Sequence, residues 1–151
     1  MAAGTAAALP GLGFAPAAAA QGPALSPGRA RTLAALVSAV GAERGNAIDP
    51  REGGAAADAL GREYPEHNAD IRRTIDIVLD TIEDGPSDGR FSDLDDEQRL
   101  RFLRSWLARP RSGSATAADT RRITIAQSGI DLAARFFYAD PVEFHPAAVT
   151  V

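Results

Sequence analysis

Only two side chains of this sequence, His67 and His145, could exchange a proton near neutral pH as a general acid or base. Both stand close to a proline, in segments that predict loops. A His-Glu-x-x-His or Glu-x-x-His pair, which a helical di-metal centre needs, does not occur. The chain has no cysteine, which excludes disulfides, thiolate metal sites and cysteine nucleophiles. We therefore expect a protein that is not an enzyme and holds no cofactor or metal. A small enzyme that uses a histidine with nearby carboxylates is the weakest alternative.

Two groups of carboxylates could bind a cation, and another role is favoured for each. Asp76, Asp80 and Asp84 recur every four residues and line one face of a helix, which we interpret as its solvent-facing side. The second group lies around a predicted helix start, where backbone donors and the helix dipole favour negative charge. Its members are Asp93, Asp95, Asp96 and Glu97. Cation binding stays open as the alternative for both groups.

The charge pattern argues against nucleic acid as a partner. The formal net charge is −4, and all 16 basic residues are arginines interspersed with carboxylates. Phosphate binding needs a clustered basic face, so a nucleic-acid-binding protein is not expected.

Aromatic side chains crowd the end of the last predicted helix. Adjacent residues on a helix cannot all face one core, so some of these rings must be covered by something else. Either the C-terminal tail folds back over them or another protein covers them, since exposed apolar patches commonly mark interfaces. We predict a partner interface made of Phe91, Leu94, Trp106, Phe136, Phe137, Tyr138, Pro141 and Phe144.

The elements that must position these residues are all predicted to be helices. Apolar residues recur at helical spacing between turn signals, and no segment alternates with period two for long enough to form a strand. The helices are predicted to begin near Ser26, Asp49, Asp70, Asp95 and Asp119. We therefore expect an all-α, antiparallel bundle of four to five helices for residues 25–151.

Three of these helices have predicted core stripes. The third helix has the most regular one, Ile71, Ile75, Val78, Leu79 and Ile82. For the fourth we expect Leu100, Leu103 and Leu107, with Phe102 and Trp106 beside them. For the last we expect Ile123, Ile130, Ala134 and Phe137, and for the C-terminal tail a segment that lies on the bundle.

Residues 1–24 are not expected to belong to the fold. Residues 1–28 carry no charge, and Ala2–Ala20 is mostly Ala and Gly, which is too weakly apolar for a membrane span. The run Ala18-Ala19-Ala20 is typical of a signal cleavage site. We predict a twin-arginine type of export signal whose positive region lies upstream of Met1, and hence a periplasmic or other extracytoplasmic protein. The alternative is a disordered tail on a cytoplasmic protein.

Four motifs follow the export segment in order: Leu33-Ala34-Ala35-Leu36, Asp49-Pro50, Phe91-x-x-Leu94-x4-Arg99-x3-Leu103-x2-Trp106 and Phe137-Tyr138-x-x-Pro141. This order resembles the gluconate 2-dehydrogenase subunit 3 family over about residues 1–145. Family members often end with an aromatic residue and Gly-Tyr, whereas here Phe144-His145-Pro146 runs into Ala147.

This resemblance implies a small, non-catalytic helical subunit of a flavin-dependent (GMC-type) dehydrogenase of sugars and alcohols. Such a subunit typically carries the twin-arginine signal and helps the large flavoprotein to fold, to be exported and to stay stable. The complex could also bring the chain to a cytochrome subunit. The alternative from the residues alone is a freestanding bundle of the cell envelope that binds a small ligand or cation between its helices.

Overall fold

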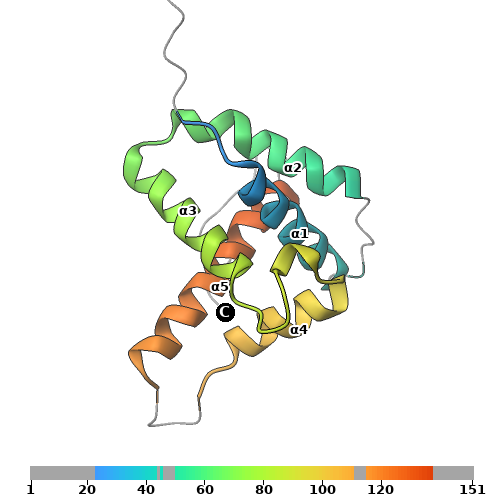
Figure 1. Ribbon diagram of the computed structural model, residues 1–151, viewed down its shortest axis with the longest axis vertical. Coiled ribbons are helices and arrows are strands. Elements are labelled where there is room, and N and C mark those ends of the chain that lie inside the picture. The colour runs from blue at the N-terminus through green and yellow to red at the C-terminus, as the bar shows by residue number, and fades with distance from the viewer. Residues whose placement is uncertain (1–22, 44, 46–49, 111–114, 138–151) are drawn as a thin grey trace, which may run out of the picture.

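The computed structural model describes residues 23–43, 45, 50–110 and 115–137. Within them the chain forms five α-helices, two short 3-10 helices and no strand (Figure 1). The α-helices are α1 (Pro27–Glu43), α2 (Pro50–Glu63), α3 (Ala69–Glu83), α4 (Asp96–Leu107) and α5 (Ala117–Phe137), and the 3-10 helices are η1 (Tyr64–Glu66) and η2 (Phe91–Asp93). The all-α bundle expected from the sequence is confirmed.

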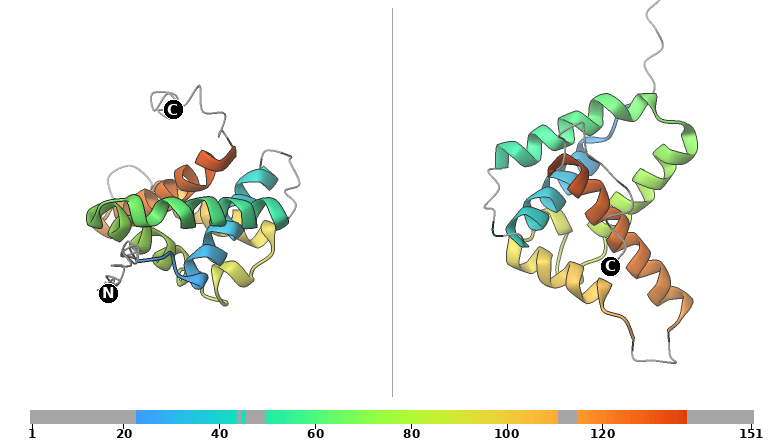
Figure 2. Two further views of the ribbon diagram at one scale, coloured as in Figure 1. Left: turned by 90° about the horizontal axis from the view of Figure 1, so that it is seen from above. Right: turned by 180° about the vertical axis from the view of Figure 1, so that it is seen from behind.

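Helix α1 is the centre of the bundle, and each of the other four α-helices packs against it. In Figures 1 and 2, α2 crosses one side of α1, while α5 crosses the other side. Because α1 has neighbours on several sides, it is apolar around most of its circumference rather than along one stripe. Its buried residues are Thr32, Leu33, Ala35, Leu36, Val37, Ala39, Val40 and Gly41.

Side chains cap the starts of several helices, as the sequence predicted for α4. Asp95 Oδ1 accepts from Gln98 N at 2.8 Å, and Gln98 Oε1 accepts from Asp95 N at 3.0 Å, so the predicted capping pair is confirmed. Helix α5 has a similar pair that sequence reasoning missed: Asp119 N donates to Thr116 Oγ1 at 3.2 Å and Thr116 N donates to Asp119 Oδ2 at 3.0 Å. The cap of α3 is Asn68, one residue before Ala69. The predicted cap Asp49 lies outside the described residues.

The core stripe predicted for α3 is confirmed except at its first member. Ile75, Val78, Leu79 and Ile82 are buried, whereas Ile71 is 44% exposed. Ile71 lies in the first turn of α3 and is not among its buried residues, so its prediction as a core residue was wrong.

The stripe predicted for α5 was in the wrong register. Ile123 is only half-buried, and Ile130 packs partly buried against the core. Gly129 is what sets this rotation, because a Cβ there would collide with Ile82 Cδ1 and also contact Leu36. The side of α5 that faces α1 and α3 is therefore made of Ile125, Ala126, Gly129, Leu132 and Ala133.

Among the helices of the described ranges, none combines the length and the apolar character that crossing a membrane requires.

Candidate functional site

Three rings lead from the core of the bundle to its surface beside α4. Phe91 is 0% exposed, and its ring centroid lies 5.6 Å from that of Phe102. The centroid of Phe102 lies 4.6 Å from that of Trp106, in a tilted arrangement typical of favourable aromatic pairs. Phe102 and Trp106 are partly buried and pack against the core. The prediction that Phe91 contacts a partner was wrong, because its ring is buried in the chain's own core. Phe102 and Trp106 are the members of the series that reach the surface.

Gly85 fixes the position of Trp106. A Cβ at this residue would lie 2.5 Å from Trp106 Cζ2 and 2.6 Å from Phe102 Cζ. Both rings therefore rest directly on the backbone between α3 and η2. Trp106 is a half-buried side chain that packs against Phe102 and Gly85.

The remaining predicted interface residues are only partly described. Leu94 follows η2 and is half-buried. Phe136 and Phe137 belong to the last turn of α5, but their side chains lie outside the described part. The other three predicted interface residues, Tyr138, Pro141 and Phe144, lie in residues 138–151, outside the described part of the chain. The second histidine, His145, lies there too. Their roles stay predictions.

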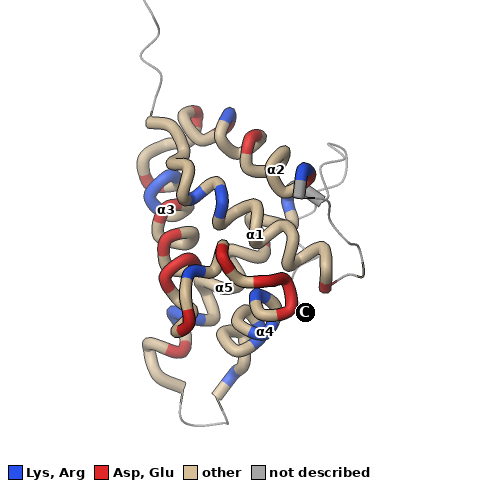
Figure 3. The backbone as a smooth tube through the Cα atoms, turned by 45° about the vertical axis from the view of Figure 1, so that its right-hand side comes forward, with Lys and Arg blue, Asp and Glu red and all other residues tan. Residues whose placement is uncertain are grey.

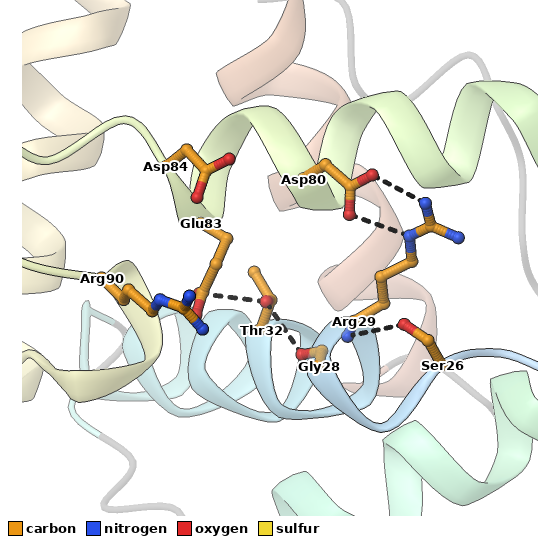
Figure 4. A pocket seen from close by; sticks show the side chains of 8 residues that line it. All are labelled: Ser26, Gly28, Arg29, Thr32, Asp80, Glu83, Asp84 and Arg90. Atoms are coloured by element: carbon orange, nitrogen blue, oxygen red, sulfur yellow. Dashed lines mark hydrogen bonds and ion pairs between the residues drawn. The ribbon is translucent and has the colours of Figure 1, made fainter.

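A polar pocket of about 190 Å³ lies between the start of α1 and the end of α3 (Figure 4). Arg29 closes one end by donating to both carboxylate oxygens of Asp80, from Nε at 2.8 Å and from Nη2 at 2.7 Å. The third guanidinium nitrogen, Nη1, lies 2.8 Å from Asp76 Oδ1. The acidic positions that recur along α3 (red in Figure 3) thus face a cation of α1 in part, so the prediction that they simply face water was incomplete. The third carboxylate, Asp84, is the C-cap residue of α3.

The same cluster includes a buried phenol. Tyr64, the first residue of η1, donates from its hydroxyl to Asp76 Oδ1 at 2.6 Å and is 3% exposed. Burial raises the pKa of Tyr64, and the hydrogen bond to Asp76 adds to the rise. The hydrogen bond from Arg29 lowers the pKa of Asp80, and the same pairing raises the pKa of Arg29. All these groups already have partners, and their bonds hold α1, η1 and α3 together.

Glu83 forms the other end of the pocket and ties three elements together. Its Oε2 accepts from Thr32 Oγ1 at 3.0 Å and from Ser92 N at 3.0 Å, and its Oε1 accepts from Ser92 Oγ at 2.7 Å. Thr32 belongs to α1, Glu83 to α3 and Ser92 to η2, so the carboxylate holds the segment of Phe91 against the core. Figure 4 shows the Thr32–Glu83 and Arg29–Asp80 bonds at opposite ends of the pocket. The pocket is smaller than the roughly 300–1,000 Å³ of ordinary ligand sites.

Neither a metal centre nor a histidine-based catalytic pair forms in the described ranges. They contain no group of three His, Asp or Glu residues that could hold a metal ion. His67 caps η1, and its Nε2 is buried without a hydrogen-bond partner, so no carboxylate orients this ring.

An apolar groove between α3 and α5 was not predicted from the sequence. It consists of two adjoining cavities of about 290 and 260 Å³, which share Thr74, Val78 and Ser128. Ile77 lines it and is 44% exposed. The available signal was Ile77 itself, a large apolar residue outside the predicted stripe of its helix.

No protein-family model, no curated protein and no solved structure matches this chain at a significant level.

Proposed function

We propose that this chain is a non-catalytic accessory subunit that binds the large subunit of a flavin-dependent alcohol or sugar dehydrogenase and assists its folding, export and stability. The resemblance in the order of sequence features suggests the class of partner. The observation that carries the proposal is Trp106, an aromatic side chain held at the bundle surface by Phe102 and Gly85.

An indole that is already packed against its own chain at the surface is well suited to bind another protein. Tryptophan is enriched among the residues that dominate interface energies. Ordering a mobile side chain on binding costs about 0.5–1.5 kcal/mol, and packing against Phe102 and Gly85 has already met much of that cost for Trp106. Leu94, at the other end of α4, is also half-buried, and the region between η2 and the end of α4 forms the described part of the proposed partner surface. Helix α5 begins near the end of α4 and runs away from it (Figure 1), so Phe136, Phe137, Tyr138 and Pro141 are proposed as a second, separate contact with the partner.

The alternative of a bundle that binds a small ligand has less support. The polar pocket between α1 and α3 measures only about 190 Å³, and its Arg29, Asp80 and Glu83 side chains are engaged with one another or with the backbone and hydroxyls of neighbouring elements. A ligand there would have to break pairs that hold the helices together.

The test is co-expression with the flavoprotein encoded by a neighbouring reading frame, followed by affinity purification of this chain. Bound flavoprotein is measured by its flavin absorbance near 450 nm. Trp106→Ala is expected to weaken the complex by about 30-fold, the effect of a 2 kcal/mol anchor. Ile71→Ala serves as the matched control, because it truncates an exposed apolar residue of α3 and should leave binding unchanged.

Because Trp106→Ala also removes a contact with Phe102, each variant is checked for native helicity by circular dichroism. Tyr138→Ala provides a second test that leaves the described bundle intact, and it too is expected to reduce co-purification. Wild-type association of both folded variants would refute the proposed interface. Finding the mature chain only in the cytoplasmic fraction would refute the proposed export.

A further inference from the structure

The groove between α3 and α5 runs along a single flank of α5. Its lining residues on α5 recur at three- or four-residue spacing, which makes them one stripe of that helix: Arg121, Thr124, Ile125, Ser128, Asp131, Leu132 and Arg135. Helix α3 supplies the opposite wall with Thr74, Ile77 and Val78. The view from behind in Figure 2 shows α5 crossing in front of α3 on this face.

The floor of this groove is apolar, and its rim is incompletely covered. Val78, Ile125 and Leu132 form buried parts of the floor. Ile77 remains 44% exposed at its edge. An apolar segment laid into the groove would remove this surface from water, at about 25 cal/mol for each Å² covered.

The segment that follows α5 starts beside the groove and is long enough to fill it. Arg135 lines the groove two residues before the helix ends at Phe137. From Arg135 back to Arg121, α5 rises by roughly 21 Å, at 1.5 Å per residue. Residues 138–151 span up to about 46 Å when extended, at roughly 3.3 Å per residue. They can therefore turn back at the end of α5 and follow the whole flank.

The sequence of this segment suits an extended occupant of an apolar groove. Pro141 and Pro146 disfavour a continued helix and favour extended backbone. In extended backbone Val142 and Phe144 point to the same side and Glu143 to the other. Two apolar side chains can thus enter the floor while the carboxylate stays at the rim.

The charges of the groove and of the segment are complementary. Arg121 and Arg135 stand at its two ends, and neither forms a salt bridge with a described residue. Residues 138–151 contain Asp140 and Glu143 and no arginine. Ion pairs at an exposed rim add little affinity, but they select orientation and register.

We propose that residues 138–151, with Val142 and Phe144 as the inserted side chains, dock into the α3–α5 groove of their own chain. This goes beyond the proposed function, because it concerns the chain without a partner. It assigns Phe144 to the chain's own surface and leaves the surface beside Trp106 to the large subunit.

Disulfide trapping tests the proposal directly, because the chain has no cysteine of its own. Ser128→Cys places a thiol in the groove, and Val142→Cys places one in the segment. Under mild oxidation this pair is expected to form an intramolecular disulfide at least 10-fold faster than the control pair Ser105→Cys with Val142→Cys. Ser105 is exposed on α4, outside the groove. Equal rates for the two pairs would overturn the proposal. Disulfide-linked dimers would overturn it too, and would indicate that a second copy of the chain occupies the groove.

Hydrogen exchange of the chain without added cysteines provides a second test. The amides of residues 142–145 are expected to exchange at least 10-fold more slowly than in a free peptide of the same sequence, and Ile77→Asp should abolish that protection. Arg135→Glu should weaken the protection, and Arg135→Glu combined with Asp140→Arg should restore it. Exchange at the free-peptide rate in the unmodified chain would refute docking. None of these measurements involves Trp106, so the outcome is separate from that of the proposed function.

Discussion

Gly53 lies where α2 closely approaches α1, and it is the glycine of α2 that has no room for a side chain. A Cβ at Gly53 would lie 2.9 Å from the carbonyl oxygen of Ala34 and 3.5 Å from its carbonyl carbon. Both atoms belong to helix backbones, so a rotamer change cannot relieve the contact, and α1 and α2 would have to move apart. We predict that Gly53→Ala destabilises the protein, although alanine is the better helix former.

Two opposing terms set the size of the effect. Replacing glycine by alanine inside a helix stabilises it by about 1 kcal/mol. Forcing an extra methyl group into a packed interface costs about 2 kcal/mol, within the usual range for overpacking. The expected net change in the free energy of unfolding is therefore a loss of roughly 1 kcal/mol.

Gly54 is the matched control, since a Cβ there meets no atom within 4 Å. Gly54→Ala should change only the helix propensity and raise the free energy of unfolding by about 1 kcal/mol. The free energies of unfolding of the two variants should therefore differ by about 2 kcal/mol. Urea denaturation followed at 222 nm measures the difference. With an m-value of about 1.5 kcal/mol/M, the midpoints should differ by roughly 1.3 M. A midpoint for Gly53→Ala at or above that of the wild type would refute the close approach of the two helices.

Three further predictions concern single polar contacts. Glu83→Ala should lower the free energy of unfolding by about 2–3 kcal/mol in urea denaturation, because it leaves the donors of Ser92 without their acceptor. Asp95→Ala should cost about 1 kcal/mol, measured in the same way, because it removes the cap of α4. Burial and the hydrogen bond to Asp76 raise the pKa of Tyr64 in the folded state. The protonated phenol therefore contributes its full stabilisation below its unfolded-state pKa of about 10, and this stabilisation is lost as pH rises through its folded-state pKa. The urea midpoint should fall as pH rises above about 10 in the wild type and fall less in Tyr64→Phe; an equal fall would contradict this assignment. The chain has no lysine or cysteine to mask the effect.

The features that could be predicted from the sequence are those decided by residues close together in the chain. The capping pair of Asp95 and Gln98 spans three residues, and its hydrogen bonds follow from local backbone geometry. The buried face of α3 follows from the helical period alone, and Val78, Leu79 and Ile82 obey it. The number of helices follows for the same reason, because each has its own start and stop signals.

The features that could not be predicted depend on which helices lie side by side. Arg29 and Asp80 are 51 positions apart, and nothing local to either residue indicates their pairing. Phe91 belongs to a short 3-10 helix, where no apolar period indicates burial; its position is fixed by Glu83 through Ser92. The rotation of α5 is set by the contact of Gly129 with Ile82, so a period read from α5 alone gives the wrong face.

The central position of α1 limits where this bundle can bind another polypeptide. Since α2, α3, α4 and α5 all pack against α1, its apolar circumference is used within the chain. Apolar surface that remains open in the described part must then lie on the outer helices, and it does so at the ring of Trp106 on α4 and in the α3–α5 groove beside Ile77. The groove begins where α5 ends and has at each end of its flank an arginine that pairs with no described carboxylate, which favours the chain's own acidic segment as its occupant. Trp106 of α4 packs against Phe102 and Gly85 on another part of the bundle, and the surface beside it is the one we propose for the large subunit.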